Sequence, residues 1–177
     1  LEINPWLAQA HYNRGNVYDK LGQYSQALVD YNKALEINPR YANAYNNRGN
    51  TYNELGQYNQ AIADFNKALE INPGLAQAYN NRGNTYNELG QYSQALVDYN
   101  KALEINPRYA DAYYNRGVVY SKLGQHNQAL ADYTNAIEIN TRDVRAYFNK
   151  ALVCEKVGRT KEAIEAYQSF IQYAPSQ

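Results

Sequence analysis

Residues 44–52 read AYNNRGNTY, and the same nine letters return at residues 78–86, 34 positions further along the chain. The return of nine residues at a fixed distance indicates a duplicated structural unit. The same spacing extends over the 177 residues of the sequence. Proline recurs every 34 residues, except that a threonine takes its place once, at Pro5, Pro39, Pro73, Pro107, Thr141 and Pro175. The chain is therefore predicted to be an array of repeats.

Each repeat contains two helical stripes that a glycine separates. In the second repeat Tyr45, Gly49 and Tyr52 lie at i, i+4 and i+7, which places them on one helix face. Gly56 ends this helix because glycine adopts the positive φ of a helix terminus without steric cost. Pro73 ends the next helix, since proline disfavours the α region for the residue before it. The predicted helices span residues 8–21, 24–37, 42–55, 58–71, 76–89, 92–105, 110–123, 126–139, 144–157 and 160–173.

Small and large residues recur in a way that predicts close helix packing. A glycine inside a helix, such as Gly49, costs about 1 kcal/mol relative to alanine, so its recurrence implies a neighbour too near for a β-carbon. An aromatic residue follows an alanine by four positions in every repeat, at Tyr31, Phe65, Tyr99, Tyr133 and Tyr167. One helix pair cannot bury its stripe alone, so stacked repeats must share one core.

The order of glycine, tyrosine, alanine, aromatic, alanine and proline resembles the tetratricopeptide repeat. The resemblance implies an all-α fold, a right-handed superhelical α-solenoid of helix-turn-helix repeats. It also implies one array over residues 1–177, in which residues 1–7 are the tail of a truncated repeat. The five full repeats are predicted at residues 8–41, 42–75, 76–109, 110–143 and 144–177.

Charge and hydropathy exclude several classes of partner. The 17 basic and 17 acidic side chains give a net charge of zero, whereas nucleic-acid binding needs a clustered surplus of Lys and Arg. No apolar run approaches the roughly 20 residues that span a bilayer. The first residues carry no basic and apolar leader. We therefore expect no nucleic acid and no membrane as partners, and a cytoplasmic location.

The sequence offers no catalytic constellation. His11, His126 and the single cysteine, Cys154, occupy slots where other repeats carry tyrosine, so they are interpreted as packing residues. No phosphate-binding glycine loop, metal-ligand spacing or nucleophile elbow is present. We predict a protein that is not an enzyme and that has no catalytic residue, no metal site and no cofactor.

Charged residues recur in two matched registers. The acidic register is Asp30, Asp64, Asp98 and Asp132, and the basic register is Arg14, Arg48, Arg82, Arg116 and Lys150. The two registers lie at similar heights on antiparallel helices, so we predict structural ion pairs. The alternative, a cationic stripe for acidic peptides, is weaker because these charges are neutralised within the fold.

Asparagine forms a column on the first helices, which line the inner surface in the family resembled. A side-chain amide donates and accepts, so evenly spaced amides can bind a peptide backbone of any sequence. The column resembles the asparagine column in the repeat superhelix of O-linked N-acetylglucosamine transferase, which implies binding of peptide backbones. The predicted peptide-binding residues, with free amides expected at Asn47, Asn81 and Asn115, are Asn13, Asn47, Asn81, Asn115, Asn149, Asn16, Asn50, Asn84, Tyr12 and Tyr114. The alternative is that recent duplication of the repeats produced the column.

These observations favour a protein-interaction scaffold that holds an extended peptide or partner protein in its concave groove. A clamp for C-terminal carboxylates is disfavoured, because Asn81 takes the place of its arginine. Two other functions stay open: a structural spacer that associates end to end with other copies, and a targeting arm of a larger enzyme. We further expect repeat five to close the array, because Phe170 replaces an alanine where another repeat would dock.

Overall fold

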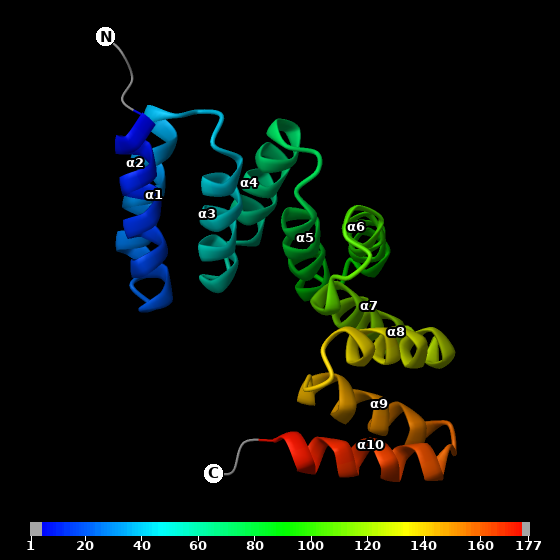
Figure 1. Cartoon of the computed structure of the whole chain (residues 1–177). Helices are drawn as coiled ribbons and strands as arrows, with labels where there is room; N and C mark the ends of the chain where they lie inside the picture. The colour runs from blue at the N-terminus through cyan, green and yellow to red at the C-terminus, as the bar shows by residue number, and fades with distance from the viewer. Residues whose placement is uncertain (1–4, 175–177) are drawn as a thin grey trace. The chain divides into compact units, whose positions relative to one another are not determined.

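The computed structural model describes residues 5–174, and these residues form ten helices and no strand (Figure 1). The helices are α1 (Pro5–Lys20), α2 (Tyr24–Ile37), α3 (Ala42–Glu54), α4 (Tyr58–Ile71), α5 (Ala76–Glu88), α6 (Tyr92–Ile105), α7 (Ala110–Lys122), α8 (His126–Ile139), α9 (Val144–Lys156) and α10 (Thr160–Tyr173). This arrangement confirms the all-α helical-repeat fold. None of these helices combines the length and the apolar character that crossing a bilayer requires.

Helix α1 starts three residues earlier than predicted, at Pro5 instead of Ala8. Proline suits the first position of a helix, because its missing N–H is one that no intrahelical carbonyl would have bound. Residues 5–7 thus form the first turn of α1, whereas the sequence suggested the tail of an earlier helix. The other residues of that predicted tail, 1–4, lie outside the described residues.

Glycine ends the first helix of each repeat as predicted. Gly56 has φ of +70°, and the next residue, Gln57, donates its backbone N–H to the carbonyl of Tyr52 at 2.8 Å. This bond reaches back over the last turn of α3 and satisfies one of its terminal carbonyls. The chain therefore reverses within a few residues and enters α4 antiparallel to α3.

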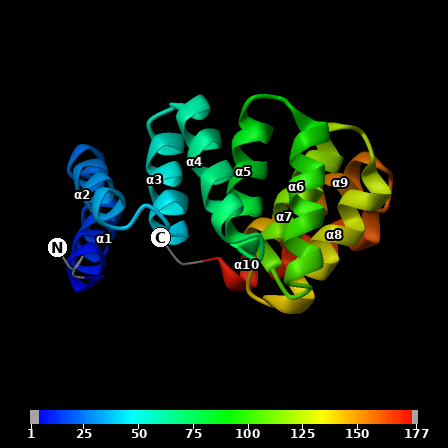
Figure 2. The same cartoon turned by 90° about the horizontal axis from the view of Figure 1, so that it is seen from above.

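The helices form two compact units, one ending at Leu89 and the other beginning at Gly90. Within each unit every helix packs on the next one in the chain, and Figure 2 shows α3, α4 and α5 side by side. The first helices of successive repeats also touch, α1 on α3, α3 on α5, and α7 on α9. In each unit the first helices therefore share a continuous face, whereas the right-handed superhelix over the whole chain stays a prediction.

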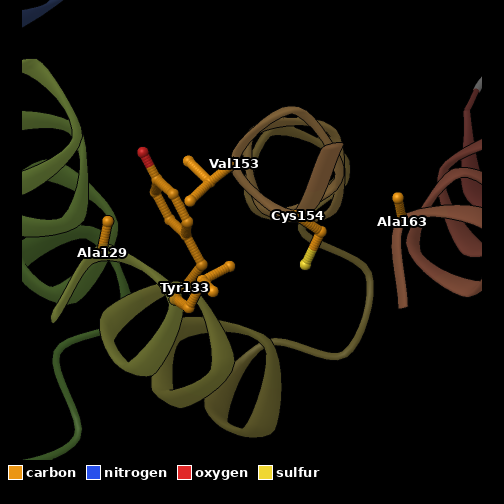
Figure 3. Close-up of a cluster of buried hydrophobic side chains, with 6 residues drawn as sticks. Ala129, Tyr133, Val153, Cys154 and Ala163 are labelled. Carbon is orange, nitrogen blue, oxygen red and sulfur yellow. The ribbon is translucent and has the colours of Figure 1, made fainter. Parts of the chain in front are cut away.

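The core consists of the predicted small and large residues. An added β-carbon on Gly49 would lie 2.8 Å from a ring carbon of Phe65, which confirms that α3 and α4 approach too closely for a side chain there. In the second unit, α8, α9 and α10 contribute to the cluster in Figure 3, which contains Tyr133, Val153 and Cys154. Cys154 is fully buried, and burial raises the pKa of its thiol, so it is a packing residue as expected.

Candidate functional site

The first unit has a polar hollow on the face that its first helices share. This hollow has a volume of about 530 Å³, and its lining residues are Asp19, Tyr24, Asn50, Asn53, Glu54, Asn81 and Asn84. A second hollow of about 200 Å³ adjoins it, with the lining residues Asn16, Asp19, Lys20, Tyr31, Asn47 and Asn50. Because Asp19 and Asn50 line both, the two hollows form one surface along α1, α3 and α5. We call this surface the amide groove.

The amides predicted to be free are engaged within the fold, so this expectation is wrong. Asn47 donates through Nδ2 to Asn16 Oδ1 at 2.8 Å and to the hydroxyl of Tyr12 at 3.1 Å. Its Oδ1 accepts from Asn46 at 3.0 Å, and Asn46 in turn accepts from Asn81 Nδ2 at 3.1 Å. Asn47 and Asn81 of the column therefore bond to the neighbouring asparagines Asn16 and Asn46, and these bonds link α1 to α3 and α3 to α5.

One of these bonds recurs in the second unit. Asn149 donates from Nδ2 to the hydroxyl of Tyr114 at 3.0 Å, as Asn47 does to Tyr12. Asn115 is half-buried and also makes an interaction within the chain. The rings of both tyrosines take part in packing, because Tyr12 lies 4.8 Å from Tyr41 and the Arg145 guanidinium lies 4.6 Å from the ring centre of Tyr114. These residues hold neighbouring repeats together.

The remaining asparagine register, one helical turn further along, faces the amide groove. Asn16, Asn50 and Asn84 line it, and all three are partly exposed. The side-chain amide of Asn50 makes no hydrogen bond to any other residue among residues 5–174. By contrast, Asn13 is exposed outside the hollows and accepts a bond from Gln9 at 2.8 Å. Asn47 and Asn81 also line the hollows, so the two registers share the groove, and Asn50 differs from Asn47 because its amide is not engaged by the described residues.

Sequence reasoning missed the acidic part of the groove. Asp19 and Glu54 contribute carboxylates, and Asp19 Oδ1 accepts from the hydroxyl of Thr51 at 2.6 Å. Asp19 follows Asn16 by three positions and Glu54 follows Asn50 by four, so each acid lies one helical turn beyond an asparagine of the groove. A search of the sequence one turn further along each helix would have found them. Lys20 is the one cation among the lining residues, and the groove therefore carries a net negative charge.

The predicted ion pairs are present in the first, second and fourth repeats, whereas Lys150 has no ion pair among residues 5–174. Arg48 donates from Nε and Nη2 to the two carboxylate oxygens of Asp64, each at 2.6 Å. Arg14 with Asp30 and Arg116 with Asp132 have the same bidentate geometry. The Arg14 guanidinium lowers the pKa of Asp30, because its hydrogen bonds favour the ionised carboxylate. These arginines are thus neutralised by their own repeat, which argues against a cationic stripe.

The histidines lie at packing positions. His11 Nδ1 is 2.9 Å from Asp30 Oδ1, beside the ion pair of the first repeat. His126 begins α8, and its buried Nδ1 has no hydrogen-bond partner among the residues that the structure describes. In the part of the chain that the structure describes, no group of three or more His, Cys, Asp or Glu side chains is placed to hold a metal ion.

Comparisons with known proteins agree with the fold. Models described as tetratricopeptide repeat match residues 8–41, 42–75, 65–97, 110–142 and 144–177, and a TPR repeat model matches residues 83–124. No curated protein matches the chain.

Several solved structures are similar to this chain. A crystal structure of MamA is 28% identical with a TM-score of 0.79, over 90% of this chain and 93% of that one. TTC0263, a thermophilic TPR protein in Thermus thermophilus, is 26% identical with a TM-score of 0.80, over 96% and 93%. PilF of Pseudomonas aeruginosa has a TM-score of 0.90 over 97% and 78%, and at 23% identity this likeness shows the fold alone.

Proposed function

The chain belongs to the tetratricopeptide repeat family, and we propose that it binds an extended peptide segment of a partner protein in the amide groove of its first unit. Its fold is that of protein-interaction scaffolds, which hold partners without catalysing a reaction. The observation that carries the finer proposal is the continuity of the two hollows, which share Asp19 and Asn50.

The groove offers hydrogen bonds that the fold does not use. Asn50 presents both the donor and the acceptor of its amide, so it can pair with the N–H and C=O of one peptide bond. Asn53 accepts from the hydroxyl of Thr85 through Oδ1 at 2.8 Å, which fixes the orientation of its amide. A side chain held in this way loses less conformational freedom when a peptide binds.

The negative charge of the amide groove determines which peptides it favours. Asp19 and Glu54 face the groove with one cation, Lys20, so an acidic peptide would meet like charge. A neutral or basic segment avoids this repulsion, and its Lys or Arg side chains can pair with the two carboxylates. The preferred ligand is therefore an extended segment with polar or basic side chains.

A matched pair of variants tests this proposal. Short random peptides displayed on phage would be selected on the chain, and the peptide obtained would be measured by fluorescence anisotropy. Asn50→Ala should weaken its binding by about tenfold, the loss expected when one well-placed hydrogen-bonding group is removed. Asn59→Ala makes the same change at an exposed position on α4 outside the hollows and should leave affinity unchanged. Equal affinities for the two variants would contradict the proposal.

The spacer hypothesis predicts a different behaviour. A chain that associates end to end should gain mass with rising concentration in static light scattering, whether or not peptide is present. The peptide-binding proposal predicts a constant mass over the same range.

A further inference from the structure

In the second and fourth repeats, the arginine of the basic register has the same two kinds of partner. In the second repeat, Arg48 binds Asp64 of its own repeat and donates from Nη1 to Asn32 of the preceding repeat at 2.6 Å. In the fourth repeat, Arg116 binds Asp132 and donates to Asn100 at 2.6 Å. Each of these cations is therefore held from two sides, by a carboxylate 16 positions later and an amide 16 positions earlier.

Repeat five lacks both partners. Its register cation is Lys150, and the position of the carboxylate is occupied by Ala166. The position of the amide is occupied by Thr134, whose hydroxyl donates instead to the carbonyl of Leu130 at 2.8 Å. Among residues 5–174, the side chain of Lys150 has neither an ion pair nor a hydrogen bond, although the residue is half-buried.

A hollow lies beside Lys150. It has a volume of about 460 Å³ and is lined by residues of α8, α9 and the start of α10. Its charged residues are Lys150, Arg159 and Glu162, and the Glu162 carboxylate is held by Nε of Arg159 at 2.6 Å. Asn127 and Asn135 add side-chain amides to the lining. The hollow thus carries a net positive charge and donors that suit an oxyanion.

Lys150 also lines a second hollow, which is acidic. A smaller hollow of about 140 Å³ is lined by Glu162 and Glu165 together with Lys150. An anion placed there would meet two carboxylates, so the favourable approach is through the larger hollow.

We propose that Lys150 and the larger hollow bind a carboxylate of a partner peptide, which takes the part that Asp64 and Asp132 take in their own repeats. The site lies in the second unit and involves none of the residues of the amide groove, so it is independent of the function proposed above. The ligand is a carboxylate, carried either by an acidic side chain or by the end of a peptide chain.

Fluorescence anisotropy with three labelled probes tests this inference. The probes are a short glutamate-rich peptide with an amidated C-terminus, the matched glutamine peptide with an amidated C-terminus, and the glutamine peptide with a free C-terminus. We expect the amidated glutamate peptide to bind and the amidated glutamine peptide not to bind. Binding of the free-acid glutamine peptide alone would still support a carboxylate site, and would identify the chain end as its source.

Two substitutions locate the binding. Lys150→Met should weaken binding of the carboxylate probe about tenfold, whereas Lys156→Met removes an exposed lysine of the same helix and should have no effect. Ala166→Asp supplies the carboxylate internally, so it should also weaken binding about tenfold and raise the melting temperature.

The inference would be overturned if Lys150→Met bound the carboxylate probe as tightly as the unaltered chain, or if Lys156→Met lost as much affinity. Equal binding of the two amidated peptides would overturn it too, because no carboxylate would then be needed. If circular dichroism showed that Lys150→Met does not fold, the test would rest on Ala166→Asp. Unchanged affinity of the folded Ala166→Asp variant for the carboxylate probe would refute the proposed carboxylate site.

Discussion

Changing Arg48 to Met should destabilise the first unit strongly, because it leaves a buried carboxylate without its partner. The side chains of Arg48 and Asp64 are 18% and 8% exposed, and two hydrogen bonds of 2.6 Å join them. Breaking a buried pair of this kind costs about 3–5 kcal/mol, and we take about 3 because Arg48 is reached by some water. For a chain of this size that corresponds to a fall in melting temperature of roughly 6–12 °C, which calorimetry or circular dichroism would record.

Two comparisons show whether the reasoning is right. Arg14→Met should cost clearly less, because the Arg14 side chain is 60% exposed and Asp30 keeps His11 at 2.9 Å. The double change of Arg48→Met with Asp64→Leu should recover much of the stability, since apolar residues can replace a buried pair at little cost. Equal losses for the two arginine variants, or no recovery in the double variant, would refute the argument that desolvation of the carboxylate sets the effect.

Three further predictions concern individual contacts. Asn47→Ala should lower the free energy of unfolding, measured by urea titration, by about 1–2 kcal/mol, because it removes the bonds to Tyr12 and Asn16. An unchanged free energy of unfolding would indicate that these bonds do not stabilise the fold and that the Asn47 amide is available to a ligand. Gly49→Ala gains about 1 kcal/mol of helix propensity, but its β-carbon overpacks Phe65 at a cost of about 1–3 kcal/mol. We therefore expect a net loss of stability. A higher melting temperature would contradict the close approach of α3 and α4. The pKa of Asp30 is lowered by its guanidinium partner, so its stabilising effect is present above the ordinary aspartate pKa of about 4 and disappears as the pH falls further. Unfolding measured from pH 7 to pH 2 should therefore show the advantage over Asp30→Asn shrinking in acid, and a constant difference would count against the ion pair.

Most of the fold could be predicted from the sequence because its determinants are local. Gly56 and Pro73 mark the ends of α3 and α4, and the predicted bounds of α4 agree with the structure at both ends. The ion pairs could be predicted for a related reason, since two helices joined by a short turn bring residues 16 positions apart, such as Arg48 and Asp64, to similar height.

The binding set could be predicted only in part. Asn47 and Asn50 are both asparagines on the same helix, and each recurs at the same spacing. Periodicity places them on the shared face but does not tell which amide reaches the helix of the preceding repeat. That depends on the separation and rotation of α1 and α3, since a hydrogen bond tolerates only a few tenths of an ångström.

The repeat, the helices and the charge register could be predicted because each follows from periodicity and from the backbone preferences of glycine and proline. The polar groups that remain available to a ligand are known only from the contacts between helices in the folded chain. Asn47 bonds to Asn16 and Tyr12, whereas the amide of Asn50 has no partner among residues 5–174. Lys150 lines a hollow and has no ion pair among the same residues, since Ala166 supplies no carboxylate. The physical reason is that an amide or an ammonium group is available for binding only when no neighbour in the folded chain has already paired with it.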